Sequence, residues 1–215
     1  IQHMLMEAGH TPFFASKSLV DLSLDANRVS RLVEATEADA WIVVAGSRPV
    51  LDWFACQNFP TFTLFGNSRD RRFAGAGPNK NPAYRECVSA LIELGHRRIV
   101  LLAKSQRRKP IPGDSEQTFL DALEEGGVKT GEYHLPDWSN RKEGLLSCLE
   151  SLFKVTPPTA LIIQEALVFA AVQQFLANRE LKVPDDVSLI CSDPDPTFAW
   201  CEPTIAHMTW RSRPI

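Results

Sequence analysis

The chain has 215 residues, of which 44% are hydrophobic and 23% are charged, a composition typical of a globular protein with a sizeable core. Its 23 basic and 26 acidic residues give a formal net charge of −3, which argues against a nucleic-acid-binding protein with a basic surface. No apolar run approaches the roughly 18–20 residues that a membrane span requires, and the first residues lack the pattern of a signal peptide.

The first residues already show helical periodicity. Ile1, Met4, Leu5 and Ala8 are spaced as the apolar face of a helix, and Gly9 is placed to end that helix. No capping residue precedes it. We therefore expect the sequence to begin inside an element, with a leading strand missing upstream.

Short apolar runs then alternate with amphipathic stretches. Up to residue 94, the pattern predicts strands at 12–15, 41–45 and 61–65 and helices at 25–37, 49–56 and 81–94. From residue 95 on, it predicts strands at 98–103, 132–135, 160–163, 187–192 and 204–210 and helices at 115–125, 141–154 and 165–178. This alternation predicts parallel sheets that are covered by helices on both faces.

The strand–helix repeats are too many for one small sheet. We therefore predict an α/β protein of two doubly wound parallel-sheet lobes, with a boundary near Gly95. The N-terminal lobe is expected to comprise residues 1–97 and the C-terminal lobe residues 98–204, and residues 205–215 are expected to return to the first lobe. The polar loop 104–114 is the longest irregular segment, and such loops often carry function.

Motifs of catalysis, phosphate binding and metal binding are absent from the sequence. There is no Walker-type phosphate loop, no GxSxG turn of an α/β-hydrolase, and no histidine spacing typical of a metal site. The pair Gly75 and Gly77 lacks the third glycine of a dinucleotide-binding fingerprint. We therefore expect no enzyme, no cofactor and no bound metal. The scattered cysteines, without any CxxC pair, predict reduced thiols of a cytoplasmic protein: Cys56, Cys87, Cys148, Cys191 and Cys201.

Four segments carry a recognisable pattern: ALIELGHRRIVLL (90–102), FLDALEEGGV (119–128), PPTALII (157–163) and LKVPDDVSLI (181–190), the last followed by Asp193. In this order they resemble signature regions of the lactose-repressor family of bacterial transcription regulators. The resemblance covers about residues 80–210, whereas residues 1–79 agree with the family in pattern only.

This resemblance implies a sensor domain with two lobes like those of class I periplasmic binding proteins. Such a sensor binds a small molecule, a sugar or sugar derivative, between its lobes and changes the DNA affinity of a fused DNA-binding head. The head is absent from this chain, and the resemblance further implies a homodimer that binds operator DNA and no membrane. Because complete lobes of the family are longer, we expect a fragment with incomplete ends.

The resemblance also implies ligand contacts at particular positions. Asp193 matches a cleft aspartate that accepts hydrogen bonds from ligand hydroxyls. Gln164 and Glu165 stand where the family has an Asn-Asp pair, so their longer side chains are expected to narrow the pocket. Asn58 matches a position that can contact a sugar, and Trp138 matches an aromatic residue that can stack on one.

Other positions change the expected ligand. Trp200 and Trp210 lie where the chain should return to the first lobe, so either could line the cleft. The family's arginine and acidic residue that address a sugar are replaced by Ser115 and by Asn81, which argues against a common hexose in the usual pose. The loop instead offers cations that would suit a sugar acid or a sugar phosphate: Lys104, Arg107, Arg108 and Lys109.

Two functions of other classes stay open. A solute-binding receptor of a transporter has the same two-lobe fold, and a leader sequence in the gene would identify it. A doubly wound enzyme without a recognisable motif is the second, and paired carboxylates with displaced pKa values in a cleft would indicate it. The sequence names neither the effector nor the operator, nor whether the effector induces or represses.

Overall fold

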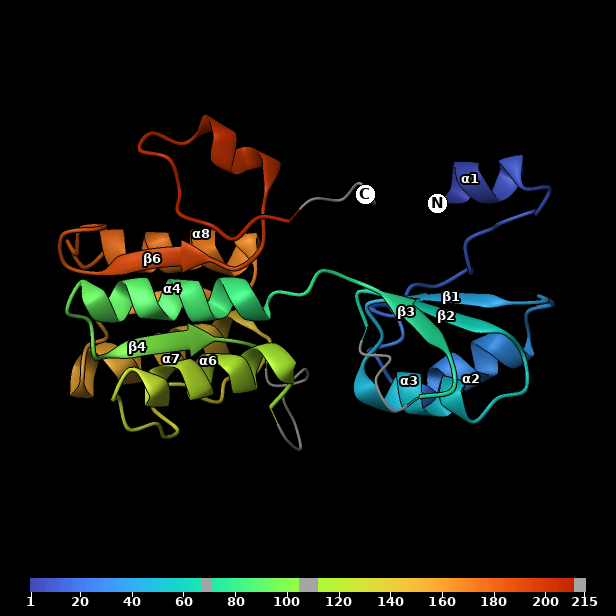
Figure 1. Cartoon of the computed structure of the whole chain (residues 1–215), viewed down its shortest axis with the longest axis horizontal. Coiled ribbons are helices and arrows are strands. Elements are labelled where there is room, and N and C mark those ends of the chain that lie inside the picture. Colours follow the sequence, from blue (N-terminus) through green and yellow to red (C-terminus); the bar gives the residue numbers. More distant parts are fainter. Residues whose placement is uncertain (67–70, 105–111, 211–215) are drawn as a thin grey trace. The chain divides into compact units, whose positions relative to one another are not determined.

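The computed structural model describes residues 1–66, 71–104 and 112–210 (Figure 1). The chain forms two compact units, residues 1–78 and residues 79–215. Each unit is built on a three-stranded parallel sheet. The predicted α/β class with parallel sheets is therefore confirmed.

The first unit has the strand order β1-β2-β3. Its elements are α1 (Gln2–Glu7), α2 (Ala26–Glu34), β1 (Trp41–Val44), α3 (Arg48–Ala55), β2 (Thr61–Leu64) and β3 (Ala74–Ala76). Helix α2 is capped by Asp25, whose side chain accepts a hydrogen bond from the Arg28 N–H at 2.9 Å. Val43 of β1 lies in a core with α2 and α3, whereas Ile42 and Val44 are 40% and 52% exposed. Helices α2 and α3 therefore cover the Val43 face of this sheet.

The second unit has the strand order β4-β5-β6, with Leu102, Ile163 and Cys191 paired at the last register position. Its elements are α4 (Asn81–Glu93), β4 (Ile99–Leu102), α6 (Asp114–Glu125), α7 (Lys142–Val155), β5 (Ala160–Ile163), α8 (Ala166–Ala177), β6 (Ser188–Cys191) and the 3-10 helix η1 (Pro196–Trp200). Every residue of β4 and of β5 is buried, as continuous apolar runs predict for strands that are covered on both faces.

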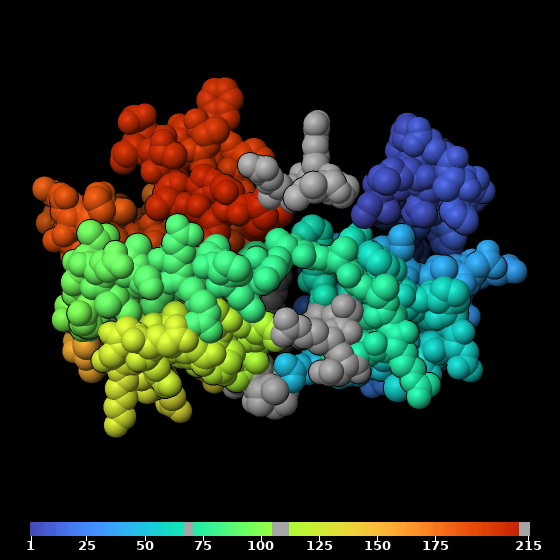
Figure 2. All heavy atoms as spheres, viewed as in Figure 1, coloured from blue at the N-terminus to red at the C-terminus, as the bar shows by residue number. Residues whose placement is uncertain are grey.

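The two faces of this second sheet pack against different helices. Leu101 and Ile162 share a core with Tyr84 of α4 and Phe119 of α6. The alternate residues of the strands share another core with α7 and α8. Helices α4 and α6 pack together, and their side chains form a continuous surface in the space-filling view (Figure 2). The second unit is therefore doubly wound, as predicted.

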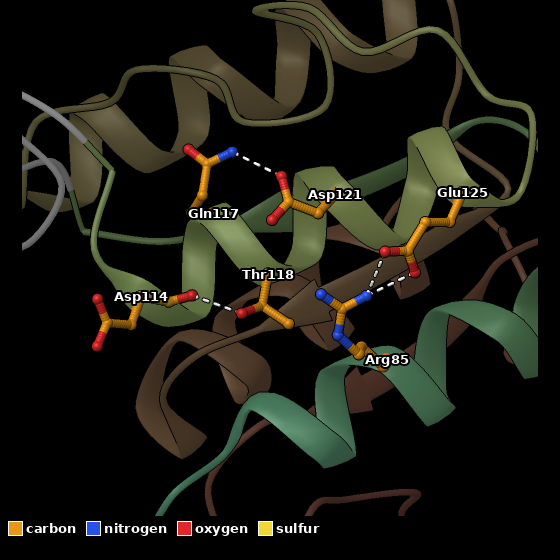
Figure 3. Close-up of polar contacts among 6 residues, drawn as sticks. All are labelled: Arg85, Asp114, Gln117, Thr118, Asp121 and Glu125. Atoms are coloured by element: carbon orange, nitrogen blue, oxygen red, sulfur yellow. Dashed lines mark hydrogen bonds and ion pairs between the residues drawn. The ribbon is translucent and has the colours of Figure 1, made fainter.

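Polar side chains link α4 and α6 on their outer surface (Figure 3). Arg85 Nη1 donates to the two carboxylate oxygens of Glu125 at 2.6 and 2.5 Å, and this partner raises the pKa of the guanidinium. Within α6, Gln117 Nε2 donates to Asp121 Oδ1 at 2.7 Å. Because these groups are exposed to water, the contacts orient the helices more than they stabilise them.

In the first unit, the strands differ from the prediction at two places. Residues 12–15 form no strand, and Phe13 and Phe14 are exposed. Strand β3 was not predicted, because its sequence Ala-Gly-Ala lacks the β-branched and aromatic residues that mark strands. It is extended by a backbone hydrogen bond, since the Phe65 N–H donates to Ala76 O at 2.9 Å.

In the second unit, two predicted strands are replaced by single backbone contacts. Residues 132–135 form turns, although the Leu101 N–H donates to His134 O at 2.8 Å beside β4. The predicted strand at 204–210 is reduced to one bridge between His207 and Cys191. Both segments lie along the sheet without forming a regular ladder.

The boundary between the two compact units lies after residue 78, earlier in the chain than the predicted boundary after residue 97. Helix α4, which that boundary assigns to the N-terminal lobe, packs against α6 in the second unit, because its apolar face (Tyr84, Val88 and Leu91) is buried there. The described residues 205–210 also belong to the second unit. The assignment of functional lobes, with a return of the last residues, stays a prediction.

His96 joins the amino-terminal ends of β5 and β6. Its Nδ1 lies 2.9 Å from Thr159 Oγ1, and its Nε2 lies 3.3 Å from Ser188 Oγ. His96→Ala removes both contacts and is expected to lower the free energy of unfolding of the second unit by about 1–2 kcal/mol. Urea denaturation measures this loss, with the exposed His10→Ala as the matched control. Equal losses in the two variants would refute the role given to His96.

Candidate functional site

The strands of the second unit end side by side, and polar residues follow each of them. Since the strands are parallel, their ends form one edge of the sheet, here called the carboxyl edge (Figure 1). Open α/β sheets bind ligands at this edge. Neighbouring strands lie about 4.8 Å apart, so three strand ends span about 10 Å, the size of a small metabolite. The residues that follow the strands are Lys104, Gln164, Glu165, Ser192 and Asp193.

An ion pair joins the ends of β4 and β5. Lys104 Nζ lies 2.7 Å from Glu165 Oε2, and each side chain is 23% exposed. Glu165 also stands at the N-cap position of α8, but its carboxylate makes no capping hydrogen bond to that helix. The carboxylate therefore neutralises Lys104 in place of capping α8, and both groups stay within reach of solvent.

A second ion pair and an aromatic ring lie at the end of β6. Lys80 Nζ pairs with Asp193 Oδ1 and lies 4.7 Å from the centre of the Trp210 ring. Trp210 reaches this place because residues 206–208 run beside β6, with backbone hydrogen bonds to Cys191 at 2.8 and 2.9 Å. A carboxylate and an aromatic face around one ammonium group form a cation site, which Lys80 itself fills.

A buried polar layer adjoins these pairs. Gln164 Nε2 donates to Glu116 Oε1 at 2.6 Å, and both side chains are buried. Gln164 Oε1 and Ser192 Oγ are also buried, and neither has a hydrogen-bond partner among the described residues. Burial raises the pKa of the Tyr84 hydroxyl, and the Ser192 and Gln164 side chains, which lie close to it without the geometry of a regular hydrogen bond, oppose part of that rise. Buried polar atoms without a partner are rare in proteins, so this layer is a place to expect a ligand or water.

The raised pKa of Tyr84 predicts a loss of stability at high pH. The unfolded chain releases this proton near the ordinary tyrosine pKa of 10.0, whereas the folded chain keeps it. Above pH about 10 the unfolded state binds fewer protons, so the free energy of unfolding falls by up to about 1.4 kcal/mol per pH unit. Tyr84→Phe removes the titrating hydroxyl, so the free energy of unfolding of this variant is expected to decrease less between pH 8 and 11. Urea unfolding of both proteins at pH 8 and 11 tests the expectation, and identical pH dependences would contradict it.

Four of the eight predicted ligand contacts lie together at the carboxyl edge. Gln164 and Glu165 follow β5, Asp193 follows β6, and Trp210 lies over Lys80. Their proximity follows from the parallel register and from the bridge beside β6. That they contact an effector stays a prediction.

Of the other four predicted contacts, three belong to other parts of the two units, and the fourth cannot be placed. Trp138 is 6% exposed and belongs to the core with α7 and α8, so it is placed for packing. Asn58 is exposed and precedes β2, at the amino-terminal edge of the first sheet. Trp200 is 90% exposed at the end of η1. Arg107 lies outside the described residues.

Four residues of the site were not among the predicted contacts. Ser192 directly precedes Asp193, and Glu116 lies in the first turn of the helix after the polar loop, so strand and helix ends could have indicated both. Lys80 and Tyr84 have no such local signal. The partner of Lys80 is 113 positions away in the sequence, and only folding joins them.

The carboxyl edge is not the only part of the second unit with a candidate binding surface, because a surface pocket lies elsewhere on this unit. A surface pocket of about 410 Å³ lies at the opposite edge of the second sheet, where the residues preceding the strands line it. Its two arginines are engaged within the chain: Arg98 Nε donates to Pro157 O at 2.7 Å, and Arg179 Nη2 lies 2.5 Å from Glu150 Oε2. The carboxyl edge, in contrast, presents partly exposed lysine side chains and, within the described part of the chain, buried polar atoms that have no hydrogen-bond partner.

The described residues hold no group of three His, Cys, Asp or Glu side chains that could bind a metal ion. Cys56, Cys87, Cys191 and Cys201 are free thiols, and burial raises the pKa of the Cys87 thiol to about 12, which keeps it protonated. Among the helices described, none has the length and apolar character to cross a membrane.

Comparison with known proteins agrees with this architecture. The family model of the periplasmic binding protein-like domain matches residues 88–213, more than half of the chain. A curated relative, the probable HTH-type transcriptional regulator EndR of Paenibacillus polymyxa, is 32% identical over 124 residues, which are 56% of this chain and 36% of the relative. The chain thus spans about a third of that relative's length.

Two solved structures show the same fold at low sequence identity. A putative LacI transcriptional regulator from Bacillus cereus subsp. cytotoxis matches with a TM-score of 0.74 and 19% identity, over 96% of this chain and 74% of that one. A sugar-binding LacI-family regulator from Escherichia coli, solved in complex with phosphate, matches with a TM-score of 0.68 and 19% identity, over 95% of this chain and 74% of that one. The chain belongs to the periplasmic binding protein-like domain family.

Proposed function

We propose that this chain is the effector-binding part of a bacterial transcription regulator. The observation that carries the proposal is the carboxyl edge of the second unit, where the partly exposed side chains of Lys80, Lys104, Glu165 and Asp193 lie near buried polar atoms that have no hydrogen-bond partner among the described residues. The effector is a small polar molecule, a sugar or a sugar derivative. Membership of the family and the regulator relative support the regulatory role.

The effector acts by shifting populations. A ligand changes an equilibrium between two conformations only by the difference between its affinities for them. The effector is proposed to bind one arrangement of the two units more tightly and so to change the operator affinity of a DNA-binding segment outside these residues. The regulator is proposed to be a cytoplasmic homodimer without a catalytic step.

Gln164, Glu165, Asp193 and Trp210 are the proposed effector contacts within the described residues. Each lies at the carboxyl edge, and the Trp210 ring offers an apolar face beside charged groups. A receptor for transport is less favoured, because the relatives named above are transcription regulators.

Chromatin immunoprecipitation of the tagged full-length protein in its host tests the regulatory role. We expect a small set of discrete DNA sites, with changed occupancy at some of them when the carbon source changes. Sedimentation of the purified protein tests the dimer. A protein that occupies no discrete DNA sites under any condition would contradict the proposed function.

A further inference from the structure

We infer that the effector carries an anionic group, a carboxylate or a phosphate, which accepts hydrogen bonds from Lys80 and Lys104. The inference rests on the proposed function, because it concerns the same carboxyl edge, and it names the chemical class of the effector. Three features support it: two partly exposed lysine side chains, the N-terminus of α8 without a side-chain cap, and a buried hydroxyl that has no hydrogen-bond partner among the residues described.

The ammonium groups already engage the carboxylates that the resemblance implies for effector hydroxyls. Asp193 pairs with Lys80, and Glu165 lies 2.7 Å from Lys104. An ammonium group has three N–H donors, and the side chains of Lys80 and Lys104 are 21% and 23% exposed, so donors remain for a ligand. A ligand rich in acceptor oxygens complements these N–H donors better than a sugar hydroxyl does. A sugar hydroxyl would also need a protein acceptor for its own proton, and the carboxylates of Asp193 and Glu165 are already paired with the lysines.

The N-terminus of α8 adds backbone donors at the same edge. This 12-residue helix has no side-chain cap and no acidic residue in its first turn. The Glu165 carboxylate, which could have capped it, lies against Lys104. The free N–H groups of a first turn and the partial positive charge of a helix N-terminus favour an anion.

Ser192 gives an independent observation. Its side chain is 1% exposed, and Oγ has no hydrogen-bond partner in the described part of the chain. The Ser192 N–H donates to Ile163 O at 2.8 Å, so this hydroxyl lies beside the strand that leads into α8. A serine hydroxyl can donate to an oxyanion, and such charge-assisted hydrogen bonds are strong.

The acidic groups of the edge are each engaged by another side chain of this unit. Asp193 and Glu165 are each neutralised by a lysine, and Glu116 is engaged by Gln164 at 2.6 Å. A cationic effector fits less well, because the Lys80 ammonium already occupies Asp193 and the face of Trp210.

Thermal shift and calorimetric titration of the full-length protein test the inference. The panel contains neutral mono- and disaccharides, their sugar acids, their phosphate esters, their amino sugars, and inorganic phosphate alone. We expect acids or phosphate esters to raise the melting temperature, and the neutral and amino counterparts of each active ligand to bind at least about ten times more weakly. Carboxylates and phosphates form separate arms, which show which anion is recognised.

Variants of the lysines localise the effect. For the active ligand, Lys80→Met and Lys104→Met are each expected to raise the Kd about 10- to 100-fold, whereas Lys80→Arg keeps it within about threefold. Lys129→Met, at an exposed position outside the edge, is the matched control and should leave the Kd unchanged.

The outcomes separate this inference from the proposed function. If neutral sugars stabilise the protein, and Lys80→Met does not weaken this stabilisation, the inference of an anionic effector is wrong. The proposed regulatory function is not affected by that result. Binding of an acid or phosphate that tolerates both methionine variants would overturn the assigned donors. A protein that binds no member of the panel would overturn the inference, while discrete DNA sites in the host would still support the regulator.

Discussion

Phe119→Ala is expected to lower the free energy of unfolding of the second unit by about 3–5 kcal/mol. Phe119 is fully buried in α6 and shares a core with Tyr84 of α4 and with Leu101 and Ile162 of the sheet. Truncation removes the apolar contact area of the ring and leaves a cavity, because the packed neighbours cannot close it completely.

Urea unfolding followed by circular dichroism measures this loss. The matched control is Leu167→Ala, an apolar truncation at an exposed position of α8 in the same unit, which should change the free energy of unfolding by less than about 0.5 kcal/mol. Similar losses in both variants would mean that the face of the sheet covered by α4 and α6 is not packed as described.

Glu116→Ala is expected to lower the free energy of unfolding by about 2–3 kcal/mol. The substitution removes the acceptor of the Gln164 Nε2 hydrogen bond, which is 2.6 Å long and buried. The amide of Gln164 is then left with an unsatisfied donor where water has poor access. Leaving a buried polar group without its partner costs more than the hydrogen bond contributes.

Glu116→Gln is the matched variant for this prediction. Its amide oxygen can still accept from Gln164 Nε2, so the loss should stay below about 1 kcal/mol. Glu116→Ala is also expected to weaken effector binding more than Glu116→Gln does, because Glu116 fixes the orientation of the Gln164 side chain at the carboxyl edge. Equal destabilisation by alanine and glutamine would show that the negative charge matters rather than the hydrogen bond.

The parts of the fold that the sequence predicted are those with a strong local signal. Strands β4 and β5 are continuous apolar runs, and burial on both faces is what such runs indicate. Strand β3 was missed because Ala-Gly-Ala has no strand signal of its own, and the neighbouring strand β2 supplies its hydrogen bonds. The predicted strand at 12–15 failed for the opposite reason, since two adjacent phenylalanines gave an apolar signal without a neighbour to pair with.

The residues of the candidate site also fall into those that the sequence predicted and those that it did not. Gln164, Glu165 and Asp193 directly follow predicted strands, so the topology rule for parallel sheets placed them at one edge. The lysines that neutralise these carboxylates could not be paired with them from the sequence, because no period links Lys80 to a residue 113 positions away. Trp138 shows the converse limit, since an aromatic residue expected to line a pocket packs equally well into a core.

The contact between Lys80 and Trp210 has a consequence for protein engineering. These residues lie close to the first and the last described positions of the second unit, and their side chains meet at 4.7 Å. The segment before α4 and the segment after η1 therefore meet at one point of the second unit. Surface segments with adjacent ends tolerate insertions. A reporter domain inserted at either segment would thus lie beside the same ion pair, that of Lys80 and Asp193.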